Sequence, residues 1–129
     1  MPLFFSILSL FVTTLYFASP AKAGDYVLHP VSDGIYYHQG VHQDATANNI
    51  GAIANVGFIV GEQCVAVIDS GGSYHEGKLL RNAIRQHTSL SVCYVINTHV
   101  HPDHILGNAA FKADNPKFVG HEKLPAALA

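Results

Sequence analysis

The stretch NTHVHPDHILGN, residues 97–108, contains the strongest signal in this sequence. Three histidines and an aspartate fall within six residues of it, at His99, His101, Asp103 and His104. His99 and His101 are two residues apart, so their rings point to the same side in extended backbone. Pro102 predicts a tight bend and the start of a short helix, which turns Asp103 and His104 to a neighbouring position. We therefore predict that the four side chains converge at one edge of the domain.

This combination of side chains predicts a metal site. Burying three imidazoles and a carboxylate near a strand end is costly unless they have a partner. Imidazole nitrogens and a carboxylate without a thiolate suit zinc, and also iron or manganese. A catalytic metal keeps one position open for water, and this ligand set leaves room for it. The isolated histidines are expected to be surface or loop residues without a ligand role: His29, His38, His42, His75, His87 and His121.

Strand-like runs lie on both sides of the histidine stretch. SVCYVIN (91–97) leads directly into it, and its nearly uniform apolar character predicts a strand covered on both faces. NVGFIV (55–60) and CVAVID (64–69) are separated by three turn residues and predict a β-hairpin. DYVLHPVSDGIYYHQG (25–40) holds two more strand-like runs around a Ser-Asp-Gly turn, and KFVGH (117–121) predicts a short last strand.

A helical pattern separates the hairpin from the strand at 91–97. Ser73 followed by Glu76 is a capping box at its start. One apolar face is formed by Leu79, Leu80, Ala83 and Ile84. The resulting order, a β-meander followed by β-α-β-α-β, favours a layered α/β fold with helices covering a sheet. Open α/β sheets place ligand sites at the carboxyl ends of strands, where the histidine stretch lies.

Length and composition limit the class of protein. The 129 residues allow one small domain, and 49% hydrophobic against 12% charged residues are enough for a folded core. The formal net charge is −2, and no basic stripe indicates nucleic acid binding. The expected partner is a small-molecule substrate.

Residues 1–23 predict a signal peptide rather than part of the fold. An apolar run from Leu3 to Phe17 is followed by Pro20 and by Ala21-Lys22-Ala23, a small-x-small cleavage site. An uncleaved membrane anchor is the alternative, but the run is short for a full span. Cleavage leaves residues 24–129 as an exported domain, periplasmic or secreted, with no stable membrane span.

Cys64 and Cys93 are the two cysteines. Neither belongs to a C-x-x-C pair, so a structural zinc knuckle is unsupported. Each lies five residues before the end of a strand-like run, at Asp69 and Thr98, so parallel neighbouring strands would bring the thiols together. Because bridges between adjacent strands are often strained, two buried free cysteines are the preferred interpretation and a disulfide is the alternative.

At these residues the chain resembles a known family. THVHPDH, residues 98–104, matches the highly specific H-x-H-x-D-H signature of the metallo-β-lactamase superfamily. VAVIDSGGS (65–73) resembles that family's strand ending in an aspartate and glycines, and NVGFIVGE (55–62) resembles the hairpin before it. The resemblance covers nearly all of residues 24–129. Within the superfamily it is most similar to exported members described as quinoprotein-relay zinc metallohydrolases.

The resemblance implies the amino-terminal half of an αββα sandwich, an α/β fold whose mixed sheet carries helices on its outer face. It implies two zinc ions in the complete protein, with iron possible. His99 and His101 would bind the first ion, and Asp103 and His104 the second. Asp103 would also orient the metal-bound hydroxide that attacks the substrate, and Asp69 would support the metal-binding loop. The implied activity is hydrolysis of an ester, amide, lactam or thioester.

The chain departs from the family's pattern at its carboxyl end. Members supply a third ligand to the first metal, a bridging aspartate and a final histidine from positions that would come after Ala129. We therefore expect an apolar sheet face that the carboxyl-terminal half should cover, weak zinc binding, and no robust hydrolysis by this chain alone. An iron-dependent sulfur dioxygenase and a non-catalytic metal-binding remnant or interaction module are the alternatives.

Overall fold

The computed structural model describes residues 26–129, so the predicted signal peptide at 1–23 lies outside the described residues. The elements in chain order are β1 (His29–Ser32), β2 (Ile35–His38), β3 (Val56–Val60), β4 (Val65–Ile68), α1 (Tyr74–His87), β5 (Val92–Ile96), α2 (Pro102–Ile105), the 3-10 helix η1 (Leu106–Asp114), β6 (Lys117–Val119) and α3 (Leu124–Ala127). None of the helices within 26–129 has the length and apolar character that a membrane span requires.

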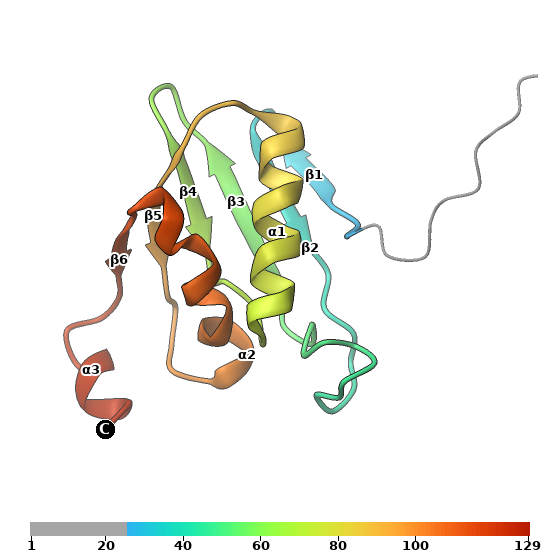
Figure 1. Ribbon diagram of the computed structural model, residues 1–129, viewed down its shortest axis with the longest axis vertical. Helices are drawn as coiled ribbons and strands as arrows, with labels where there is room; N and C mark the ends of the chain where they lie inside the picture. Colours follow the sequence, from blue (N-terminus) through green and yellow to red (C-terminus); the bar gives the residue numbers. More distant parts are fainter. Residues whose placement is uncertain (1–25) are drawn as a thin grey trace, which may run out of the picture.

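The strands form one mixed sheet in the order β1-β2-β3-β4-β5-β6 (Figure 1). The first four strands are an antiparallel meander, and β4, β5 and β6 are parallel to one another. The parallel connections pass through α1 and through α2 with η1, as the predicted β-α-β-α-β order requires. The carboxyl ends of β4 and β5 therefore lie side by side, and the chain leaves both of them at the same edge of the sheet.

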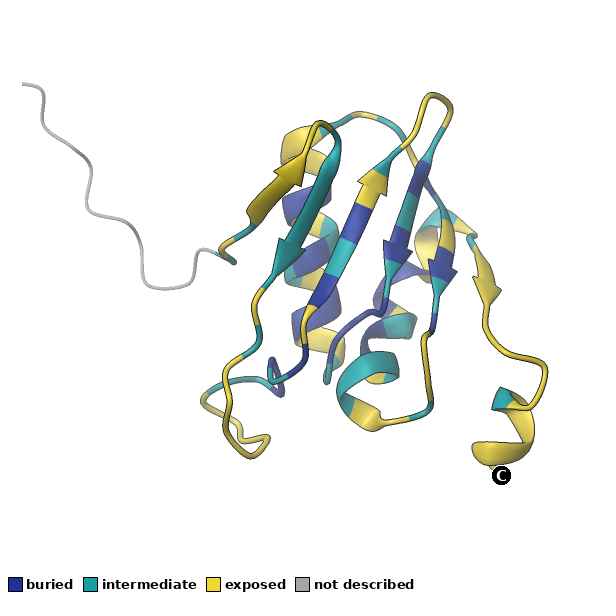
Figure 2. Ribbon diagram, turned by 180° about the vertical axis from the view of Figure 1, so that it is seen from behind, coloured by how far each residue is buried: buried dark blue, intermediate teal, exposed yellow. Residues whose placement is uncertain are grey.

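Helices cover one face of this sheet and leave the other face open (Figures 1 and 2). The core between α1, η1 and the sheet is formed by Val56, Phe58, Val65, Val67, Leu80, Ile84, Val92, Val95, Ala110 and Phe111. On the open face, Ile59 of β3 and Val119 of β6 are exposed. This agrees with the apolar sheet face that the sequence led us to expect.

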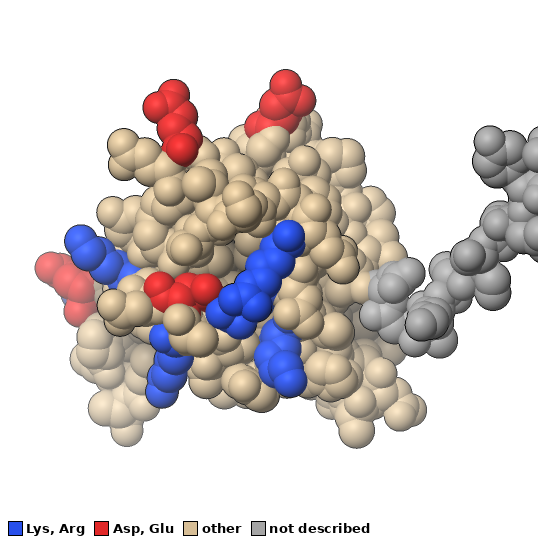
Figure 3. All heavy atoms as spheres, turned by 45° about the horizontal axis from the view of Figure 1, so that its top comes forward, with Lys and Arg blue, Asp and Glu red and all other residues tan. Residues whose placement is uncertain are grey.

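The prediction that both faces of β5 are covered is wrong. Val92 and Val95 are buried, whereas Tyr94 is 39% exposed on the open face. Within the described residues only one layer of helices packs on the sheet, so the apolar character of 91–97 does not match its burial. The face drawn in Figure 3 carries acidic and basic side chains together, without a continuous basic patch.

Helix α1 begins where the capping pattern predicts. The Ser73 hydroxyl accepts a hydrogen bond from the Glu76 backbone N–H at 3.0 Å. In a capping box the Glu76 side chain would accept from the Ser73 backbone N–H. Here its Oε2 accepts instead from the N–H of the preceding residue, Gly72, at 2.6 Å. Arg81 of α1 holds η1 through a bidentate pair with Asp114, in which Nη2 lies 2.9 Å from Oδ1.

Cys64 and Cys93 form a disulfide, so the preferred interpretation of two free cysteines is wrong. The parallel pairing of β4 with β5 places Val65 opposite Val92, which brings the flanking cysteines to a Cα–Cα distance of 5.9 Å. That separation is within the usual range for a disulfide. The bridge joins the amino ends of the two strands, at the end of the sheet opposite the histidine stretch.

Candidate functional site

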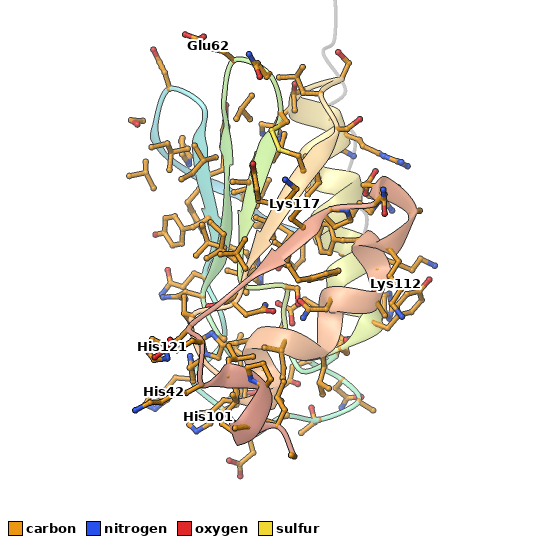
Figure 4. The ribbon with its side chains drawn as sticks, turned by 90° about the vertical axis from the view of Figure 1, so that its left-hand side faces the viewer. His42, Glu62, His101, Lys112, Lys117 and His121 are labelled. Carbon is orange, nitrogen blue, oxygen red and sulfur yellow. A yellow bond between two sulfur atoms is a disulfide. The ribbon has the colours of Figure 1, made fainter. Side chains whose placement is uncertain are left out.

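The histidine stretch runs from the end of β5 through α2 into η1. His101 is the residue before α2, and it lies at the opposite end of the molecule from Glu62 in the β3–β4 turn (Figure 4). Asp69 follows β4 directly and reaches the same edge as this stretch, because β4 and β5 are parallel. The edge is therefore built from two strand ends and the start of a short helix.

The three histidines of the stretch lie together. The ring centroids of His99 and His101 are 4.7 Å apart, and those of His99 and His104 are 4.0 Å apart. His104 Nε2 lies 3.4 Å from Asp103 Oδ2. The extended backbone before Pro102 and the bend after it thus bring all four predicted side chains to one edge of the sheet.

Asp69 connects this cluster to the sheet. Its carboxylate is buried, and Oδ1 accepts from the Thr98 backbone N–H at 2.8 Å. Oδ2 accepts from the Thr98 hydroxyl at 2.7 Å and lies 2.7 Å from His104 Nδ1. Asp69 adopts a left-handed backbone conformation with φ of 56°, which few residues other than glycine take up at low cost. Three hydrogen bonds to the carboxylate stabilise Asp69 in this backbone conformation.

These hydrogen bonds determine which ring nitrogens carry protons. An ionised carboxylate can only accept, so the Nδ1 of His104 donates to Asp69. The single Thr98 hydroxyl proton goes to Asp69, so this hydroxyl accepts from His99 Nδ1 at 2.9 Å. In the neutral form of each ring, Nε2 then keeps its lone pair. Such Nδ1 hydrogen bonds are the usual support of metal-binding imidazoles.

The donor chemistry of the cluster fits a metal ion, but the side chains do not form a complete chelating set. With Nδ1 of the neutral ring protonated, the His104 Nε2 lone pair and the Asp103 carboxylate lie 3.4 Å apart, so both are electron-pair donors that a cation could accept. Among residues 26–129, no three His, Cys, Asp or Glu side chains are placed so that they could share one metal ion. The described residues thus bring the predicted groups together without closing a three-ligand site.

A buried carboxylate lies beneath the loop that follows Asp69. Glu76 is 0% exposed, and its carboxylate accepts from the Gly72 N–H and, at 3.1 Å, from the Tyr26 hydroxyl. Burial raises the pKa of Glu76 to about 7, and the two hydrogen bonds oppose that rise. Gly71 has φ of 96°, and a β-carbon there would overlap the Glu76 carboxylate, so this position favours glycine.

The sequence agrees with a known family over much of its length. The family model described as the metallo-beta-lactamase superfamily matches residues 50–128, which is more than half of the chain. The chain belongs to the metallo-β-lactamase superfamily. The matched region includes β3 to β6, Asp69 and the whole histidine stretch. The signature motif of this superfamily chain follows the carboxyl end of β5, as predicted from the sequence.

Solved structures confirm the fold of this superfamily chain. It superposes on TMB-1, a protein characterised for substrate and inhibitor binding, with a TM-score of 0.64 and 16% sequence identity. The match covers 79% of this chain and 45% of the TMB-1 chain, so the protein described here spans less than half of that structure. No curated protein matches the sequence at a significant level.

Asp69 was expected beside the cluster from the family resemblance, but sequence reasoning missed the other residues that support the four predicted side chains. Thr98 lies inside the recognised motif, yet its two hydrogen bonds to Asp69 required the pairing of β4 with β5. Asn97 and Asn108 border the stretch and bond to each other, a contact with no local signal in the sequence. His121 is exposed, and its Nδ1 accepts from the Lys123 N–H at 3.2 Å, which is a local contact.

Proposed function

We propose that this chain supplies the first metal ligands of a zinc-dependent hydrolase. The observation that carries the proposal is the hydrogen-bond chain from His99 through Thr98 and Asp69 to His104, which orients two imidazoles and leaves both Nε2 atoms free. Superfamily membership supports a metal-dependent hydrolase-type fold. Zinc fits the imidazole and carboxylate donors.

Each residue of the cluster has a separate task in this proposal. His99 and His101 would hold one ion, and Asp103 and His104 a second. When bound, zinc would acidify a water molecule and polarise the bond to be hydrolysed. Asp103 would accept a hydrogen bond from that water and orient it. Asp69 would hold His104 in the correct tautomer, and Thr98 would do the same for His99.

The expected substrate is a small molecule with a carbonyl group, such as an ester, amide, lactam or thioester. The sheet edge is open to solvent on the side of His99 and His101, both of which are exposed. A catalytic zinc needs about three protein ligands plus water, whereas each pair here offers two. We therefore propose that the activity requires further ligands beyond those among residues 26–129.

Metal titration of the full chain tests this function. Binding of Zn²⁺ or Co²⁺ is expected to be weak, and His99→Ala or Asp103→Ala should weaken it by at least about 10-fold. His42→Ala is the matched control, because His42 is an exposed loop histidine outside the cluster. Equal binding by all four proteins would contradict the ligand assignment. Tight zinc binding with turnover by this chain alone would show that the count of two ligands per ion is wrong.

Catalysis itself is tested by joining the chain to the rest of a superfamily domain. The joined protein should bind two zinc ions and hydrolyse an activated ester or lactam. Asp103→Ala should then remove more activity than His121→Ala, because His121 makes only a local contact. A preference for iron together with oxygen consumption would replace the hydrolase proposal with the dioxygenase alternative.

We also propose that the protein is exported to an oxidising compartment. The Cys64–Cys93 disulfide supports this, because disulfides persist in periplasmic and secreted proteins and are rare in the cytosol. Intact-mass analysis of protein from its native compartment should find Gly24 as the first residue. Recovery of a reduced cytosolic chain that retains Met1 would contradict export.

A further inference from the structure

A reciprocal pair of side-chain amides joins the two ends of the histidine stretch. The Asn108 amide donates from Nδ2 to Asn97 Oδ1 at 2.9 Å, and the Asn97 amide donates from Nδ2 to Asn108 Oδ1 at 3.1 Å. Asn97 is 6% exposed and Asn108 is half-buried. Reversing either amide alone would place like atoms against each other, so the orientations of the two amides depend on each other.

Ser70 ties this pair to the strand that carries Asp69. Its hydroxyl donates to Asn108 Oδ1 at 2.8 Å, and its backbone N–H donates to the His104 carbonyl at 2.8 Å. Ser70 is fully buried and directly follows Asp69. Asn97 directly precedes Thr98, which makes two of the hydrogen bonds to Asp69. The amide pair is therefore linked to the Asp69–Thr98 interaction from both sides. Asn97 is the residue before Thr98, and Asn108 accepts from Ser70, the residue after Asp69.

Local helix formation cannot supply the same restraint. Helix α2 has four residues and no side-chain hydrogen bond at its cap, and η1 also begins without one. A helix of four residues is unstable unless tertiary contacts hold it. The candidate ligands all lie between Asn97 and Asn108, so the amide pair closes the segment that carries them.

We propose that the Asn97–Asn108 pair is a positioning element of the candidate metal site. It fixes the path from β5 to η1 and thereby holds His99 and His104 against the Thr98–Asp69 interaction. This rests on the proposed function, in which these histidines bind metal. The alternative is that the pair only stabilises the fold, in which case its loss would lower stability without altering the geometry of the cluster.

The test uses the full chain with Asn97→Ala, Asn108→Ala and the double variant. Co²⁺ binding is followed by visible absorption, whose band positions and intensities report the coordination geometry. The metal-free chain is examined by NMR for the His104 Nδ1–H, which the hydrogen bond to Asp69 protects from exchange. Ile84→Val is the control for lost stability, because Ile84 is a core residue of α1. Asn82→Ala is the control for an exposed asparagine.

Each single asparagine variant should weaken Co²⁺ binding by about 10-fold, which is the lower end of the effect measured for residues that support a metal ligand. Each should also change the absorption bands. The double variant should bind no more weakly than Asn108→Ala, because that single variant already removes both the amide pair and the hydrogen bond from Ser70. The His104 Nδ1–H signal should broaden or disappear in the metal-free variants. Both controls should keep the unaltered spectrum and signal.

Unchanged absorption bands and an unchanged His104 signal in folded variants would overturn the positioning role. If the unaltered chain fails to bind Co²⁺, the proposed function is contradicted, and the metal-free NMR comparison still decides the role of the pair. If an alanine variant does not fold, Asn108→Ser replaces it, since serine is too short to form the reciprocal pair.

Discussion

Replacing Glu76 with glutamine should make the protein more stable at neutral and higher pH. Glu76 lies in the first turn of α1 and is completely buried, with its carboxylate bonded to the Gly72 N–H. Burial raises the carboxyl pKa from 4.5 to about 7. The folded state therefore binds a proton more tightly than the unfolded state. Stability from this group is fully present below pH 4.5 and is lost as the pH rises through 7.

The magnitude follows from the two pKa values. Each unit is worth about 1.4 kcal/mol, so ionisation of Glu76 costs the folded state about 3 kcal/mol once the pH is well above 7. Glutamine carries no charge and can keep both contacts, since its Oε1 accepts from the Gly72 N–H and its amide donates to the Tyr26 hydroxyl. Between pH 4.5 and 8, the free energy of unfolding of the variant should rise relative to that of the unaltered chain by up to about 3 kcal/mol.

Urea unfolding in the presence of a chelator measures this difference at a series of pH values. Comparing the two chains cancels the titration of every other group. Glu62→Gln is the matched control, since Glu62 is exposed in the β3–β4 turn. A Glu76→Gln difference that stays flat from pH 4.5 to 8 would refute the assignment of a buried carboxyl with a raised pKa. Glu76→Ala should be less stable at every pH, because it leaves the Gly72 N–H without a partner.

Two further stability predictions concern the links between elements. Arg81→Ala should lower the free energy of unfolding by about 1–3 kcal/mol, because it leaves the Asp114 carboxylate half-buried without its bidentate partner. Arg85→Ala, whose side chain is 58% exposed, should change it by less than about 0.5 kcal/mol in the same urea titration. Cys64→Ser should lower stability by about 3–4 kcal/mol, from the loop of 29 residues that the bridge to Cys93 closes. Reducing agent should produce the same loss in the unaltered chain and none in the variant.

Local signals in the sequence were sufficient for most of the elements. The turn residues between apolar runs predicted the hairpins, and Ser73 with Glu76 predicted the start of α1, because turns and caps are made by neighbours in the chain. The spacing of His99, His101, Asp103 and His104 likewise predicted that the four side chains lie together. Their positions depend on backbone geometry over a few residues.

The burial of β5 and the state of the cysteines depended on more distant contacts. Whether Tyr94 is covered depends on which layers pack on each face of the sheet. The sequence of an apolar strand does not distinguish one covered face from two. Whether Cys64 meets Cys93 depends on the register of β4 and β5, which are separated along the chain by α1. The equal spacing of the two cysteines from their strand ends allowed a bridge, but no pattern within either strand required β4 and β5 to be neighbours.

The sequence by itself determined which residues could bind a metal and on which elements they lie. Only the tertiary structure decided how those residues are held. Asp69 reaches Thr98 and His104 because parallel strands end together, and Asn97 pairs with Asn108 because η1 folds back on the sheet. Hydrogen bonds between residues far apart in the chain require the strands and helices to be assembled first. The family resemblance indicated Asp69, but no local pattern indicated the roles of Thr98, Asn97 and Asn108.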